Sequence, residues 1–89
     1  MDTVKIELDG AFAGWNIELR RNVSARILID LQGDTAVQFA AFAKLVVSHN
    51  FKDIEGNATD DILDAPVSAI TASMEKWATA ISADRKSVV

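Results

Sequence analysis

The chain has 89 residues, of which 49% are hydrophobic and 25% charged, with a formal net charge of −4 and no cysteine. This length and composition predict one globular domain spanning residues 1–89 and exclude a second independent core. The lack of cysteine excludes disulfides and thiolate metal sites, and it favours a reducing cytoplasmic compartment.

The negative charge is concentrated in one segment. Residues 52–65 contain five acidic residues and one lysine, a surplus equal to the net charge of the whole chain. Phosphate recognition needs a clustered basic surface, and the only local cluster is Arg20, Arg21 and Arg26, so we expect no nucleic-acid partner. Since no apolar stretch approaches the ~20 residues that span a bilayer, we also expect a soluble protein with no membrane partner.

Residues 1–20 are predicted to form a β-hairpin. Apolar and polar side chains alternate in TVKIEL and again in WNIELR, a period-two pattern typical of strands with one apolar face. Between them lies DGAFAG, whose Asp9-Gly10 pair and Gly14 accept turn conformations. Phe12 near the tip of this turn is expected either to fold back onto the hairpin or to remain exposed for a partner.

Residues 22–50 are predicted to form two helices. Asn22 or Ser24 is expected to cap the first helix, and Gly33 to take the left-handed conformation beyond its end. Thr35 and Gln38 have capping-box spacing at the start of the second. That helix is apolar nearly all round, which predicts coverage by other elements or another chain; its apolar residues are Val37, Phe39, Ala40, Ala41, Phe42, Leu45, Val46 and Val47.

The segment 51–65 is predicted to be an acidic loop, extended in part or forming a small hairpin around Gly56. Its oxygen-bearing residues have EF-hand-like spacing, but Ala58 occupies the position that needs glycine and Asp64 the position that needs glutamate, so we expect no metal. His49 is the only histidine. No nucleophile pattern accompanies it, and we expect its imidazole to satisfy a carbonyl at a helix C-terminus.

Residues 66–84 are predicted to form the last helix, beginning at Pro66. Its apolar stripe has helical spacing and comprises Val67, Ile70, Met74, Trp77 and Ile81. The predicted fold class is therefore α+β, with an N-terminal β-hairpin followed by three helices and a mainly helical core. The excess of apolar surface on the second helix favours a homo-oligomer or a docked partner.

The order of these elements resembles the tail assembly chaperones of long-tailed bacteriophages. The segment LVVSHNFKDIEGN carries most of the resemblance, because Asn50, Phe51, Asp53, Glu55, Gly56 and Asn57 match the turn that follows the long apolar helix in that family. MEKWATAI resembles its last helix. His49 stands where the family pattern favours tryptophan.

The resemblance implies a non-enzymatic assembly factor without a cofactor. Such a protein would associate with itself and with the tape measure protein, keep that protein soluble, and bring tail tube protein to it. It would act in the host cytoplasm and be absent from the mature virion. Apolar or aromatic character, together with the His49 departure, selects seven candidate interface residues: Phe12, Phe39, Phe42, His49, Phe51, Trp77 and Ile81.

An alternative function uses the acidic segment. A small acidic phage-encoded inhibitor could bind a basic surface of a host protein, with Asp53, Glu55, Asp60, Asp61 and Asp64 imitating phosphates. We expect no catalytic residue in either case, since no nucleophile, metal or cofactor constellation is present in the sequence.

Overall fold

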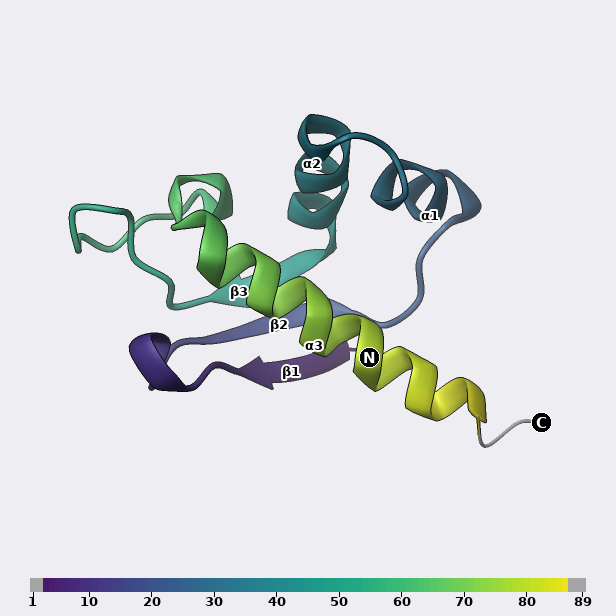
Figure 1. Cartoon of the computed structure of the whole chain (residues 1–89), viewed down its shortest axis with the longest axis horizontal. Coiled ribbons are helices and arrows are strands. Elements are labelled where there is room, and N and C mark those ends of the chain that lie inside the picture. The colour runs from purple at the N-terminus through teal and green to yellow at the C-terminus, as the bar shows by residue number, and fades with distance from the viewer. Residues whose placement is uncertain (1–2, 87–89) are drawn as a thin grey trace.

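The computed structural model describes residues 3–86. Three antiparallel strands form one sheet, and three α-helices lie against it or beside it (Figure 1). This confirms a mixed α+β fold. In chain order the elements are β1 (Thr3–Glu7), a 3-10 turn (Gly10–Phe12), β2 (Asn16–Arg20), α1 (Ala25–Leu31), α2 (Thr35–Leu45), β3 (Val46–His49), a second 3-10 turn (Ile62–Asp64) and α3 (Val67–Lys86).

The predicted hairpin is present in β1 and β2. The two strands pair in an unbroken register that places Val4 opposite Leu19 and Ile6 opposite Ile17, with all four side chains buried. The backbone N–H of Leu8 extends the ladder by donating to the Trp15 carbonyl at 2.9 Å. Gly14 has φ +89°, a conformation open to glycine and strained for most other residues, which lets the chain turn into β2.

The prediction of two helices over residues 22–50 is wrong at its end. α2 stops at Leu45, and Val46–His49 forms β3, which pairs antiparallel with β2. Val46 has φ −72° and ψ 124°, a β conformation that suits a β-branched side chain. β3 therefore pairs with the side of β2 that β1 leaves open. The predicted order of a hairpin followed directly by three helices fits only in part, because β3 lies between α2 and α3.

The predicted start of α1 is confirmed, whereas two details of the α1–α2 connection are corrected. Ser24 caps α1, its Oγ accepting from the N–H of Ile27 at 3.2 Å. Asp34 caps α2 in place of Thr35, because its Oδ1 accepts from the N–H of Val37 at 3.1 Å. Gly33 is absent from the residues with positive φ, so the link needs no left-handed residue there.

The main core lies between the sheet and α3. Leu19 is fully buried and Ile17 is 1% exposed on the sheet, and they belong to one cluster with Ile70 and Trp77 of α3. The expected helical core thus fits in part, since strand residues supply much of it. The stripe predicted on α3 is confirmed at Ile70 and Trp77, which are core residues, and at Met74 and Ile81, which pack against the core. It is wrong at Val67, which is 64% exposed, and it omitted Ser73, which is fully buried.

The described part of the chain shares a single hydrophobic cluster, to which strands, helices and the loop before α3 all contribute. The one-domain prediction also covers residues 1–2 and 87–89, which lie outside the described residues. None of the helices in residues 3–86 is both long enough and apolar enough to cross a membrane.

Candidate partner-binding groove

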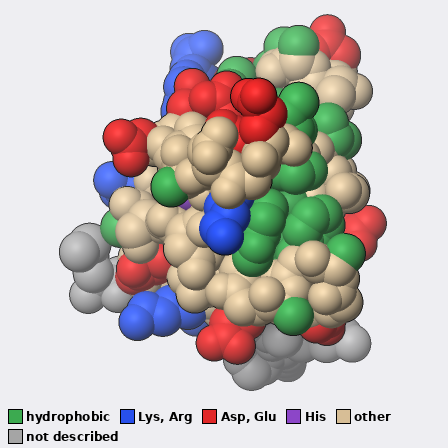
Figure 2. Space-filling model, turned by 90° about the vertical axis from the view of Figure 1, so that its left-hand side faces the viewer, with side chains coloured by type: hydrophobic (Ala, Val, Ile, Leu, Met, Phe, Trp, Pro, Cys, Tyr) green, Lys and Arg blue, Asp and Glu red, His purple; other side chains and the backbone are tan. Residues whose placement is uncertain are grey.

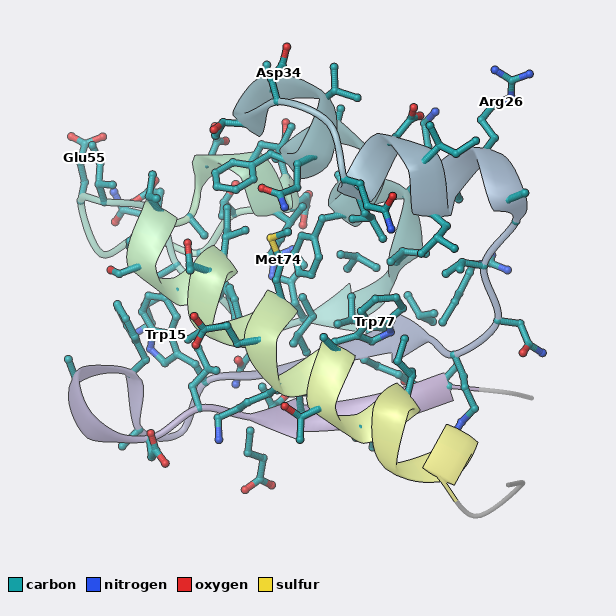
Figure 3. The ribbon with its side chains drawn as sticks, turned by 45° about the vertical axis from the view of Figure 1, so that its right-hand side comes forward. Trp15, Arg26, Asp34, Glu55, Met74 and Trp77 are labelled. Carbon is teal, nitrogen blue, oxygen red and sulfur yellow. The ribbon has the colours of Figure 1, made fainter. Side chains whose placement is uncertain are left out.

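A groove opens between α3 and the pair of helices α1 and α2, which we call the α1–α2 arm (residues 25–45). Its volume is about 370 Å³. Leu31, Phe39 and Phe42 form the wall on the arm, and Met74 and Trp77 form the wall on α3. In Figure 3, Met74 points from α3 toward the arm. Gln38, Thr71, Glu75 and Ala78 complete the lining.

The two helices of the arm differ in burial, since α2 buries Ala41, Phe42 and Leu45. No residue of α1 is buried, and its Ile29 side chain is 67% exposed. One hydrogen bond joins the two helices of the arm through a side chain: Gln38 Nε2 donates to the Leu31 carbonyl at 2.9 Å. Gln38 therefore connects the helices of the arm and takes no part in the predicted capping box.

A row of four aromatic rings lies at the turn end of the sheet. Phe12 and Trp15 have ring centroids 4.9 Å apart, Trp15 and Phe51 5.3 Å, and Phe51 and His49 5.7 Å. Stacked and tilted aromatic pairs at such separations add stability beyond their buried area. Three predicted interface residues thus form one row through Trp15, which the sequence treated only as part of the hairpin.

The environment of His49 differs from the prediction. The residue lies in β3, and its Nδ1 accepts a hydrogen bond from the N–H of Phe51 at 3.1 Å, so it satisfies no helix-terminal carbonyl. Its neighbour Asn50 connects β3 to the hairpin. Asn50 Oδ1 accepts from the N–H of Asn16 at 2.7 Å, and Nδ2 donates to the Gly14 carbonyl at 3.1 Å.

The acidic segment uses several of its side chains to hold its own backbone. Asp53 Oδ1 accepts from the N–H groups of Glu55 and Asn57, each at 2.9 Å, and a bridge between Lys52 and Ala58 closes the small hairpin that the sequence allowed. Asp61 caps the following 3-10 turn. Within residues 3–86, no three His, Asp or Glu side chains converge in a group fit to hold a metal ion.

Charge is distributed toward opposite ends of the molecule. Glu55 lies at the tip of the acidic loop, and Arg26 of α1 lies at the far end (Figure 3). Figure 2 looks onto the loop end, where acidic side chains gather beside an apolar area. Exposed apolar residues close to this segment in the chain include Ile54 and Leu63, which are 81% and 45% exposed.

The seven candidate interface residues divide by burial. Phe42, Phe51 and Trp77 are core residues with at most 5% exposure, whereas Phe12, Phe39 and Ile81 are half-buried and pack against the core. His49 is half-buried in β3. Phe39, Phe42 and Trp77 meet at the groove, whose partners Leu31 and Met74 were not selected from the sequence.

Met74 was recognised only as part of a helical stripe. Its half-buried side chain packs against the core and also lines the groove.

The chain was compared with protein-family models, with curated proteins and with solved structures, and none of the three comparisons found a match. The groove is therefore interpreted from its own geometry and from the resemblance described above.

Proposed function

We propose that this chain is a tail assembly chaperone that associates with itself and binds apolar segments of a tape measure protein. The observation that carries the proposal is the groove between the arm and α3, which is open and has aromatic, leucine and methionine side chains on its walls. Apolar grooves between helices are suited to the apolar face of an amphipathic helix. Methionine adapts to partners of different shape, which suits a long and irregular client.

The same groove supports a non-enzymatic role better than a catalytic one. Its polar lining residues are Gln38, Thr71 and Glu75, which offer no nucleophile paired with a base. Gln38 is further engaged by its hydrogen bond to Leu31. In this proposal the chain covers apolar tape measure segments in the host cytoplasm, brings tail tube protein to them, and leaves before the virion is complete.

Co-expression tests the proposal. A cognate tape measure protein is expected to stay soluble and to elute with the chain, and to precipitate without it. Met74→Glu places a charge on the groove wall and is expected to weaken the complex about tenfold, since apolar contacts in such pockets dominate binding. Affinity would be measured by calorimetry with apolar tape measure peptides.

Two further variants on α3 distinguish a charge placed in the groove from the same charge placed elsewhere on the helix. Thr71→Glu adds a charge at an exposed position of the groove lining and should weaken binding without disturbing the core. Val67→Glu adds the same charge on the same helix, at a side chain that is 64% exposed and absent from the groove lining. Equal binding by all three variants, or a tape measure protein equally insoluble with and without the chain, would refute the proposal.

A further inference from the structure

The two edge strands of the sheet, β1 and β3, differ in length and in how regularly they pair with β2. β3 is four residues long, its pairing with β2 is irregular between Glu18 and Leu19, and the hollow beside it is lined in part by Asp60 and Asp61. β1 is five residues long, pairs with β2 in an unbroken register, and lies at the rim of the sheet (Figure 1). Within residues 3–86, no strand pairs with its outer side.

The register identifies which backbone groups of β1 face outward. Leu8 donates its N–H to Trp15, and Ile6 lies opposite Ile17 in the same register. Antiparallel ladders alternate between residues bonded to the neighbouring strand and residues that face away from it. The N–H and C=O groups of Thr3, Lys5 and Glu7 therefore point away from β2, available to another strand.

When two copies of β1 run antiparallel to each other, the charges of one strand are complementary to the charges of the other. We propose that β1 pairs antiparallel with β1 of a second copy about a two-fold axis at Ile6. This register sets Lys5 of each copy opposite Glu7 of the other, and it joins the outward backbone groups of both residues. A one-residue shift of the axis would instead place Lys5 opposite Lys5 or Glu7 opposite Glu7, both of which are destabilising.

The polar face of the sheet continues the same charge pattern. Lys5 lies opposite Glu18 within the chain, and Glu18 Oε2 accepts a hydrogen bond from Thr3 Oγ1. In the paired sheet each Lys5 has Glu18 on one side and Glu7 of the second copy on the other. Two rows of alternating sign thus cross the junction, and each favourable pair strengthens the sheet.

The opposite face of the junction is apolar. The proposed axis brings Ile6 beside Ile6 of the second copy and Val4 beside Leu8, so the two cores become continuous. The resulting dimer has one six-stranded sheet, with an α1–α2 arm and its groove in each half.

This inference specifies the self-association named in the proposed function, but its pairing residues lie on β1 and none of them lines the groove between the arm and α3. The two therefore fail separately. A chain that stays monomeric yet binds tape measure peptides refutes the β1 pairing and leaves the groove proposal standing. A dimer that binds no such peptide does the reverse.

Charge reversal tests the pairing through complementary variants. In a dimer of Lys5→Glu chains, the side chains at positions 5 and 7 of both copies are acidic. In a dimer of Glu7→Lys chains, they are all basic. Each variant alone is expected to raise the dissociation constant of the dimer about tenfold or more, as two attractive pairs become two repulsive ones. An equimolar mixture of the two is expected to recover dimers, because the acidic junction of one variant then faces the basic junction of the other in both pairs.

Sedimentation equilibrium over a range of concentrations measures these constants, and circular dichroism establishes that each variant is folded. Glu7→Lys is the cleaner single variant, because Glu7 lies opposite the uncharged Asn16 within the chain, whereas Lys5 lies opposite Glu18. The double variant Lys5→Glu/Glu7→Lys restores both pairs and should dimerise again. In the wild-type dimer, the amide hydrogens of Lys5 and Glu7 are expected to exchange more slowly as concentration rises.

A wild-type chain that remains monomeric at millimolar concentration would overturn the pairing. So would a dimer whose dissociation constant is the same in the wild type, both single variants and their mixture. Dimers that form without concentration-dependent protection of the Lys5 and Glu7 amides would place the contact elsewhere on the molecule.

Discussion

Two regions of the molecule use their apolar residues differently. One region is the sheet together with α3, and the other is the α1–α2 arm. In the first region, Leu19 and Ser73 have no exposed surface and Ile70 only 1%. In the arm, α1 buries no residue, and the apolar side chains Ile29 and Val37 are 67% and 41% exposed. Stability is therefore concentrated in the sheet, α3 and the buried side of α2, which includes Phe42 and Leu45, whereas α1 keeps apolar surface available for binding.

Replacing an isoleucine by alanine in each region should give the largest difference in the free energy of unfolding. Ile70→Ala removes a fully packed side chain and is expected to lower the free energy of unfolding by about 2–5 kcal/mol. That is a large share of the roughly 5–10 kcal/mol expected for a domain of this size. Ile29→Ala, at an exposed site on α1, should change it by less than about 0.5 kcal/mol. Urea denaturation of both variants measures the difference, and equal losses would mean that the arm is as well packed as the sheet.

Asn50→Ala should have an intermediate effect on the sheet region. The substitution removes the hydrogen bonds that its side chain makes with the backbones of Asn16 and Gly14, and we expect a loss of roughly 1–2 kcal/mol. Thermal denaturation is the measurement. Asn57→Ala is a matched control in the neighbouring loop, and a loss at Asn57 as large as that at Asn50 would argue against this connection.

Asp34→Ala should have a smaller effect than Asn50→Ala, and the effect should be confined to the arm. It removes the cap of α2 and is expected to destabilise by about 1 kcal/mol. Amide hydrogen exchange should show faster opening near the start of α2, with little change in β1 or β2. Asp60→Ala, at an exposed position of the acidic loop, provides the control. Faster exchange throughout the sheet would show that the two regions open as one unit.

The sequence predicted the local elements well because their signals are local. Alternation in residues 3–20 was sufficient for the hairpin, and of the two residues that could cap α1, Asn22 and Ser24, the structure uses Ser24. β3 was missed because Val46 and Val47 continue the apolar run of α2, whereas the strand forms against an edge of β2 that lies far away in the sequence. The β-branched pair itself was the available signal.

The candidate site was harder to predict for the same reason. Phe39 was selected for its aromatic character, and it does line the groove together with Phe42 and Trp77. The sequence does not show which side of α3 approaches the sheet. Ala69 and Ser73, two small residues outside the predicted stripe, are fully buried, and Met74 lines the groove beside the arm.

The place of β3 in the chain also has a consequence for the order of folding. β1 and β2 are joined by a short turn, so their pairing closes a small loop and is expected to form early. β3 pairs with β2 only after both helices of the arm have been synthesised and the chain has returned. On the ribosome, the side of β2 that faces β3, which carries the outward backbone groups of Asn16 and Glu18, therefore stays unpaired until then, and this side is where we expect premature association between nascent chains to begin.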